Sequence, residues 1–109
     1  MAYDTHLASR LRQALHRRPN VKEREQFGGI GFLVQGNMAC GVIGKDLLVR
    51  VGPEEHERAL KDKHARVFSL TGKPSRGWIL VRPAGLGTDA ALLRWVDLGI
   101  RFARSLPAK

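Results

Sequence analysis

Apolar residues recur at helical spacing near both ends of the chain, whereas they alternate with polar residues in between. The first pattern predicts a helix over residues 5–17, with Asp4 as its N-cap because a carboxylate accepts hydrogen bonds from free amides there. The second predicts a longer helix that starts at the cap Thr88 and ends before Pro107. The two apolar stripes consist of Leu7, Leu11, Ala14 and Leu15 and of Leu92, Trp95, Val96, Gly99, Phe102, Ala103 and Leu106.

Short apolar segments with two-residue alternation predict strands between the helices. The first four segments are residues 21–27, 30–34, 38–43 and 47–51. Because only short turns separate them, an antiparallel meander is the simplest topology, and the charged first segment suits an exposed edge of the sheet. Two further strands are expected at residues 67–70 and 78–81, on either side of a polar loop at 71–77.

Glycine and proline mark the turns between these elements. The residues predicted to form turns are Gly28, Gly29, Gly36, Gly52 and Pro53. Gly36 is followed by Asn37, and both residue types tolerate positive φ. Pro53 is followed by two glutamates, a combination that favours the first turn of a short helix. Gly28 and Gly29 lead into a strand rather than a helix, so they indicate a tight turn or bulge and not a phosphate-binding loop.

The order of the elements predicts a single α+β domain over residues 1–109. Helix, strands, short helix, strands and long helix follow one another, and such a series packs as two layers, an antiparallel sheet with helices packed on it. A chain of 109 residues is long enough for one core and too short for two domains. The side chains expected to be buried are Leu11, Phe32, Val49, Trp95 and Phe102.

Charge and composition narrow the classes of partner. The chain has 19 Lys and Arg against 10 Asp and Glu, a formal net charge of +9, which attracts polyanions. The basic residues are spread over the whole length, so they predict only nonspecific, salt-sensitive nucleic-acid binding, and solubility alone also explains them. A single cysteine excludes an internal disulfide, and the sequence shows neither a signal-peptide pattern nor an apolar run that could span a membrane. A cytoplasmic protein without membrane contact is therefore expected.

No residue pattern typical of catalysis accompanies these features. The four histidines lack the spacing of a metal site. Cys40 lies in an apolar strand pattern, so a buried and unreactive thiol is expected rather than a nucleophile. The sequence therefore predicts no metal, no cofactor and no catalytic residues, and the protein is not expected to be an enzyme.

Basic residues near two predicted turns form the candidate binding site. Arg50 precedes the second helix start, and Lys73 and Arg76 lie in the polar loop between two glycines. These three cations would form an anion-binding or partner-binding site if the two segments meet in space. Trp78 beside them would offer a ring for stacking. The alternatives are that the loop cations are solvated, that Arg50 pairs with Glu54, and that Trp78 packs on the sheet.

Several motifs, which occur in order along essentially the whole chain, resemble those of the TfoX N-terminal domain family. They are Phe27-Gly28-Gly29, Gly36-Asn37-Met38, the run from Leu47 to Pro53, Thr71-Gly72-Lys73-Pro74, Gly77-Trp78, Thr88-Asp89-Ala90-Ala91 and the run from Ala103 to Pro107. The resemblance implies a two-layer α+β fold similar to secretion chaperones and YgaC-like proteins, with no established catalytic residues. The TfoX/Sxy regulators of bacterial competence carry a further C-terminal helical domain, whereas this chain is expected to be a stand-alone domain.

Together these observations predict a non-enzymatic cytoplasmic binding or regulatory module that acts through a protein partner. The alternative is a basic nucleic-acid-associated domain linked to transcription or competence regulation. The small size and the edge-like first strand predict a monomer or a weak homodimer.

Overall fold

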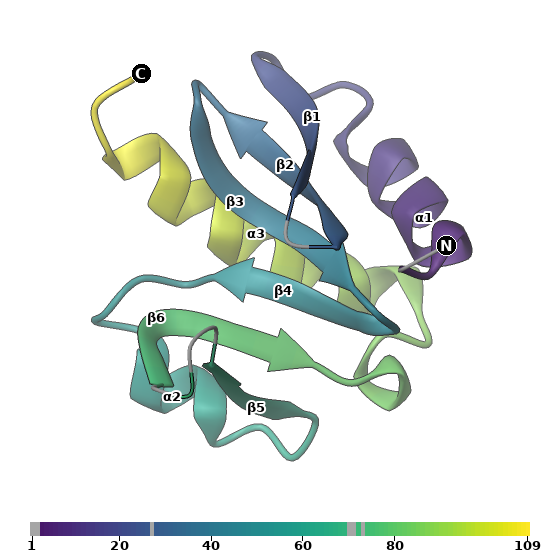
Figure 1. Cartoon of the computed structure of the whole chain (residues 1–109), viewed down its shortest axis with the longest axis vertical. Coiled ribbons are helices and arrows are strands. Elements are labelled where there is room, and N and C mark those ends of the chain that lie inside the picture. Colours follow the sequence, from purple (N-terminus) through teal and green to yellow (C-terminus); the bar gives the residue numbers. More distant parts are fainter. Residues whose placement is uncertain (1–2, 27, 70–71, 73) are drawn as a thin grey trace.

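The computed structural model describes residues 3–26, 28–69, 72 and 74–109. This part of the chain forms a six-stranded antiparallel sheet with helices on one face, so the predicted two-layer α+β architecture is confirmed (Figure 1). The helices are α1 (Thr5–Leu15), α2 (His56–Leu60) and α3 (Asp89–Ser105), with a 3-10 turn, η1, at Pro83–Gly85. The strands are β1 (Val21–Gln26), β2 (Gly29–Val34), β3 (Asn37–Ile43), β4 (Asp46–Arg50), β5 (Ala65–Ser69) and β6 (Pro74–Val81).

The strand order is β1-β2-β3-β4-β6-β5. The meander is confirmed for the first four strands, each of which pairs antiparallel with the next, and β1 is an edge as predicted. The meander does not continue to β5, because α2 carries the chain to the other edge and β6 returns to pair with β4. β6 begins at Pro74, so the loop predicted over 71–77 is too long. Residues 70, 71 and 73 lie outside the described residues.

The side chains on one face of the sheet form the core with α1, α2 and α3. Those whose predicted burial is confirmed are Leu11, Phe32, Val49 and Trp95. The prediction for Phe102 is wrong, because this side chain is only half-buried and Ile100 is the buried residue of that turn. Phe102 lies beyond the core, where its ring contacts the position at which Gly52 would carry a Cβ atom.

Gly99 allows α3 to approach the sheet closely, as its place in the apolar stripe predicts. A Cβ atom at this position would overlap the carbonyl oxygen of Ala39 on β3. A residue larger than glycine would therefore push the helix away from the strands that it covers.

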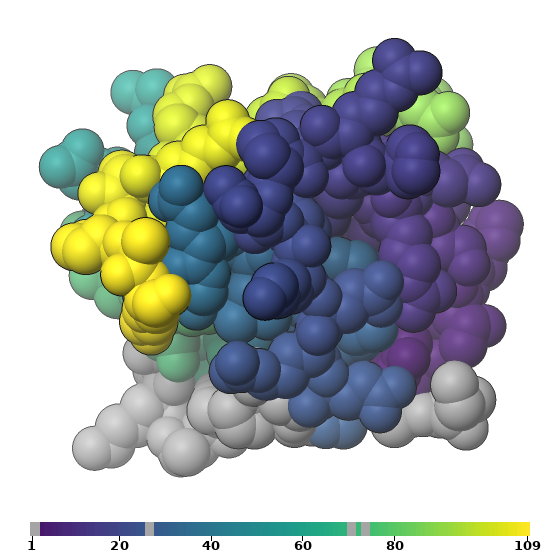
Figure 2. Space-filling view, turned by 90° about the horizontal axis from the view of Figure 1, so that it is seen from above, coloured from purple at the N-terminus to yellow at the C-terminus, as the bar shows by residue number. Residues whose placement is uncertain are grey.

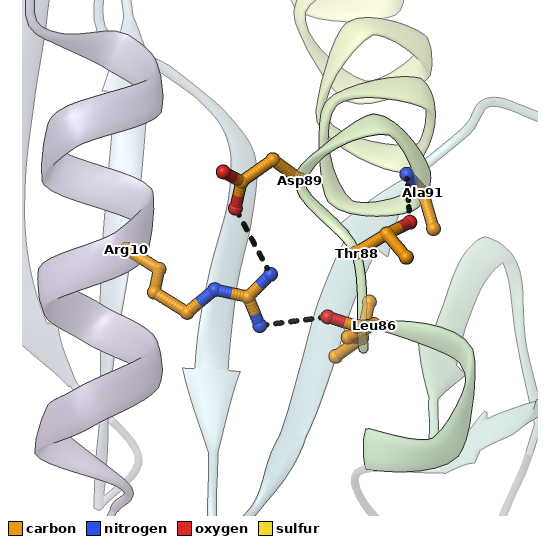
Figure 3. Close-up of polar contacts among 5 residues, drawn as sticks. All are labelled: Arg10, Leu86, Thr88, Asp89 and Ala91. Carbon is orange, nitrogen blue, oxygen red and sulfur yellow. Dashed lines mark hydrogen bonds and ion pairs between the residues drawn. The ribbon is translucent and has the colours of Figure 1, made fainter.

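Polar contacts define the ends of the two long helices. The carboxylate of Asp4 accepts hydrogen bonds from the amides of residues 6 and 7, and the hydroxyl of Thr88 accepts one from Ala91, so both predicted N-caps are confirmed. Arg10 on α1 donates to the carbonyl oxygen of Leu86 at 2.7 Å and lies 3.4 Å from the carboxylate of Asp89 (Figure 3). This arginine ties α1 to the start of α3.

The helix predicted over residues 5–17 is shorter in the structure and ends at Leu15. Arg18, which follows it, forms an ion pair with Asp97 on α3. Together with Arg10, Arg18 thus links α1 to α3.

The glycines predicted to form turns have different roles in the structure. Gly28 lies in a turn with a φ of 76°. Gly29 is already the first residue of β2, where a Cβ atom would overlap the carbonyl oxygen of Val42 on the neighbouring strand. Close approach of two strands, rather than a turn, therefore explains the glycine at this position.

The β2–β3 turn is formed by Gln35 and Gly36, whose φ values are 52° and 85°. Two consecutive positive φ values are typical of the tight hairpin turn. Asn37 already belongs to β3, and its side-chain amide donates to the carbonyl oxygen of Pro107 at 2.9 Å. The pair expected to turn the chain is thus displaced by one residue.

The segment between β4 and α2 begins with Gly52, whose φ is 89°. Pro53 lies in the turn that follows, and α2 begins only at His56, so the predicted helix start lies too early.

Candidate binding groove

The face of the sheet opposite the helices, which we call the uncovered face, carries apolar residues at its centre. Leu33, Leu48 and Leu80 lie on this face because they alternate with core residues of β2, β4 and β6. They are only 5 to 8% exposed, although no helix of the described residues packs over them (Figure 1). Neighbouring side chains on the curved sheet therefore bury them.

A groove of about 400 Å³ lies on the uncovered face. Its lining residues are Arg24, Leu33, Gly36, Met38, Leu48, Arg50, Phe68, Ser75, Trp78 and Lys109. The lining thus combines aliphatic side chains, two aromatic rings and three cationic residues. The cationic residues are Arg24 on the edge strand β1, Arg50 on the central strand β4, and Lys109 at the end of the chain. Apolar surface with a few polar groups is the usual character of a ligand site.

Arg50, a predicted site residue, lies at the end of β4 and faces this groove. Its guanidinium carbon is 5.0 Å from the ring centroid of Trp78 and 5.2 Å from that of Phe102. Burial lowers the pKa of Arg50 from its ordinary value. Within the described part of the chain Arg50 forms no ion pair, so the alternative that it pairs with Glu54 gives way to stacking on two rings.

Arg76, the second predicted site residue, points toward α2 instead. Its guanidinium lies 3.9 Å from the carboxylate of Glu57 and donates to the carbonyl oxygen of Pro53 at 3.5 Å. The cause is a bulge in β6 at Gly77, whose φ is 91°. The pairing of β6 with β5 shifts register there, because Val67 pairs with Ile79 but Ser69 pairs with Pro74. The bulge shifts the alternation along β6, so that Ser75 and Trp78 line the groove.

Lys73, the third predicted site residue, lies outside the described residues. Of the three cations proposed from the sequence, the structure therefore places Arg50 in the groove and Arg76 against α2. Trp78, named from the sequence as a stacking ring, shares the groove with Arg50 and Phe68; its ring centroid is 6.4 Å from that of Phe68, with the planes at 46°.

His56 supports the bulge from the helix side, a role that the sequence does not reveal. Its side chain is buried, and its Nδ1 accepts a hydrogen bond of 3.0 Å from the amide of Gly77. This hydrogen bond requires the lone pair of Nδ1 to face the amide of Gly77.

Two further groove residues come from parts of the sequence that carried no site prediction. Arg24 lies on β1, where its alternation with Glu23 and Glu25 could have placed it on the uncovered face. Lys109 reaches the groove because its amide donates to the carbonyl oxygen of Gln35 at 2.8 Å, so the end of the chain lies beside the β2–β3 turn (Figure 2). No pattern in the sequence predicts that contact.

The described residues that could act as a nucleophile or as metal ligands are buried or lie apart from one another. Cys40 is fully buried on the helix side, and burial raises the pKa of its thiol to about 12. Among the described residues no group of three or more His, Cys, Asp and Glu could hold a metal ion. None of the helices in the described ranges is long and apolar enough to cross a membrane.

Comparison with known proteins agrees with the motifs. A search of curated proteins found no match. The family model of the TfoX N-terminal domain matches residues 13–103, a range that begins within α1, contains the whole sheet and ends within α3. Because the match covers most of the 109 residues, the chain belongs to the TfoX N-terminal domain family.

Proposed function

We propose that this domain is a non-enzymatic regulatory module that binds a protein partner through the groove on the uncovered face. The observation that carries the proposal is the lining of the groove, in which aliphatic and aromatic side chains lie beside cations. Aromatic residues and arginine are the side chains most enriched at the centres of protein interfaces. The cytoplasm of a bacterium is the setting that we propose for this role.

The groups that line the groove favour binding over catalysis. An enzyme site needs a nucleophile or a general acid or base with a suitably shifted pKa. Among the described residues that line the groove there is no His, Cys, Asp or Glu side chain that could act as general acid or base or activate the hydroxyl of Ser75. Cys40, a nucleophile by residue type, lies on the opposite side of the sheet with a pKa of about 12.

A second candidate, nucleic-acid binding, is favoured by the net charge of +9 and by the two aromatic rings in the groove. The ring of Trp78 already carries the guanidinium of Arg50, however, so a base would have to displace it. We therefore expect nucleic-acid binding to be nonspecific and to weaken steeply as the salt concentration rises.

The test is capture from a nuclease-treated bacterial lysate by the immobilised domain, with the bound proteins identified by mass spectrometry. Phe68→Ser removes an apolar wall of the groove, and Leu93→Ser, which alters an exposed apolar side chain on α3, is the matched control. We expect one set of proteins to be retained by the parent and by Leu93→Ser and to be lost with Phe68→Ser.

Capture that is equal for all three forms would overturn the proposal, because the groove would then make no contribution. Capture that is seen only in a parallel lysate without nuclease would favour the nucleic-acid alternative. Circular dichroism and melting temperature of each variant show that the fold is retained before binding is compared.

A further inference from the structure

We propose that the groove binds an extended, acidic segment of its partner, in which a bulky apolar side chain is flanked by Asp or Glu. This inference rests on the proposed function and specifies the chemistry of the partner. It follows from three features. They are the positive charge of the groove, its apolar floor, and the stacking of Arg50 on the ring of Trp78.

The first feature is the separation of charges across β1. Glu23 and Glu25 point toward the helix side, where they accept hydrogen bonds from Arg12 at 2.9 Å and from the hydroxyl of Tyr3 at 3.3 Å. Arg24, between them, lines the groove on the other side. By alternation the two carboxylates of β1 lie on the helix side of the strand, whereas Arg24 lies on the side of the groove.

The same separation holds on the central strand. Arg50 faces the groove without a carboxylate partner among the described residues. Asp46 lies on the same face of β4 by alternation, but its carboxylate is paired with Arg66 on β5. Of the described residues that line the groove, three have cationic side chains and none is Asp or Glu. An anionic ligand is the electrostatic complement of such a surface.

The second feature is the floor. Leu33, Leu48 and Met38 lie at the bottom of the groove, between Arg24 of β1 and the rings of β5 and β6; the two leucines are only 6 and 5% exposed. A volume of about 400 Å³ lies at the small end of the range for ligand sites, so it suits one large side chain and its neighbours rather than a folded surface. A peptide with one bulky apolar side chain between acidic residues can contact the apolar floor and pair with the cations of the groove at the same time.

The third feature separates a peptide from a nucleic acid. A nucleobase stacks on an open aromatic face, but Arg50 lies over Trp78 at 5.0 Å, and the ring of Phe68 is tilted by 46° from it. The rings do not form a parallel pair that could hold a base. The rings and the guanidinium instead line the groove beside the apolar floor, where a side chain and a carboxylate can bind side by side.

The test uses a fluorescein-labelled synthetic peptide with one phenylalanine between glutamates, and measures its fluorescence anisotropy with the full chain. Two control peptides replace the phenylalanine with serine or the glutamates with lysines. We expect the acidic phenylalanine peptide to bind at least about tenfold more tightly than either control. Binding should also change the emission of Trp78, since Trp95, the other tryptophan, is buried in the core.

Charge-matched variants locate the binding site. Arg24→Glu should weaken the acidic peptide about tenfold, whereas Arg17→Glu, an equal charge change at an exposed position beyond α1, should change the affinity less than about twofold. Arg24→Gln repeats the test without introducing a negative charge. Equal weakening by the changes at positions 24 and 17, or equal affinity for the lysine peptide, would overturn the inference.

A selection from a random peptide library distinguishes failure of this inference from failure of the proposed function. Selected peptides that lose binding with Phe68→Ser but carry no carboxylates would overturn the acidic ligand and leave partner binding in the groove intact. If no selected peptide depends on Phe68, and a single-stranded oligonucleotide instead binds in a Phe68-dependent manner, both proposals fail.

Discussion

The two faces of the sheet share one set of strands but have different surroundings. On β4, Leu47 and Val49 point into the helix-covered core, while Leu48 and Arg50 point to the uncovered face. Leu47 and Leu48 are both buried, at 0 and 5% exposure, so burial by itself does not separate the faces. The difference is what lies above each residue: α3 closes the core, whereas the uncovered face keeps a groove with cations at its rim. Adjacent positions in one strand therefore face a closed core and an open groove.

Alanine substitutions at these two leucines should show the largest difference between the faces. Leu47→Ala is expected to lower the free energy of unfolding by about 3–5 kcal/mol, because it leaves a cavity that the closed core cannot refill. Leu48→Ala should cost only about 2 kcal/mol, since water from the groove reaches the space. Chemical denaturation of both variants measures the difference, and equal losses would show that the uncovered face is packed as tightly as the core.

The next largest loss of stability is expected where α3 lies closest to the covered face of the sheet. Gly99→Ala is expected to cost about 1–3 kcal/mol of unfolding free energy, because its methyl group would overlap the carbonyl oxygen of Ala39. Gly87→Ala is the matched control, because a Cβ atom there meets nothing within 4 Å. Thermal unfolding of the pair tests the close contact; a Gly99→Ala melting temperature equal to that of the control would refute it.

Cys40 reports whether the covered face stays closed. Its pKa is raised from 9.0 to about 12 by burial, so a thiol reagent at pH 8 should leave the folded protein unmodified and label one thiol per chain in denaturant. The unfolded chain ionises first, so stability should fall as the pH rises from about 9 toward 12 and should be insensitive to this group below about pH 9. Cys40→Ala should lack this alkaline contribution, and rapid labelling of the folded parent would contradict the closed core.

The smallest effect is expected from the charges of β1. Glu23→Gln removes an ion pair with Arg12 in which both side chains are more than a third exposed, so the loss should stay below about 1 kcal/mol. Arg24→Glu should leave the free energy of unfolding within about 0.5 kcal/mol of the parent. Denaturation curves test both variants, and a large loss with Arg24→Glu would mean that the groove cation stabilises the sheet instead of serving a ligand.

The sequence determined the elements and the class of fold because these depend on local patterns. The caps Asp4 and Thr88, the core positions Leu11, Phe32 and Val49, and the charged edge strand all follow from spacing and residue type. The motifs also indicated the family, which the match over residues 13–103 establishes.

Only the tertiary structure decided the order of β5 and β6 and the composition of the groove. Strand order depends on which edge of the sheet the chain reaches after α2, and this is set by tertiary packing and not by a local pattern. The bulge at Gly77 reverses the alternation of β6, so Arg76 turns to α2 while Ser75 takes the groove position. Arg24, Arg50 and Lys109 line one groove although they are far apart in the chain, and no local pattern predicts this because it arises from packing.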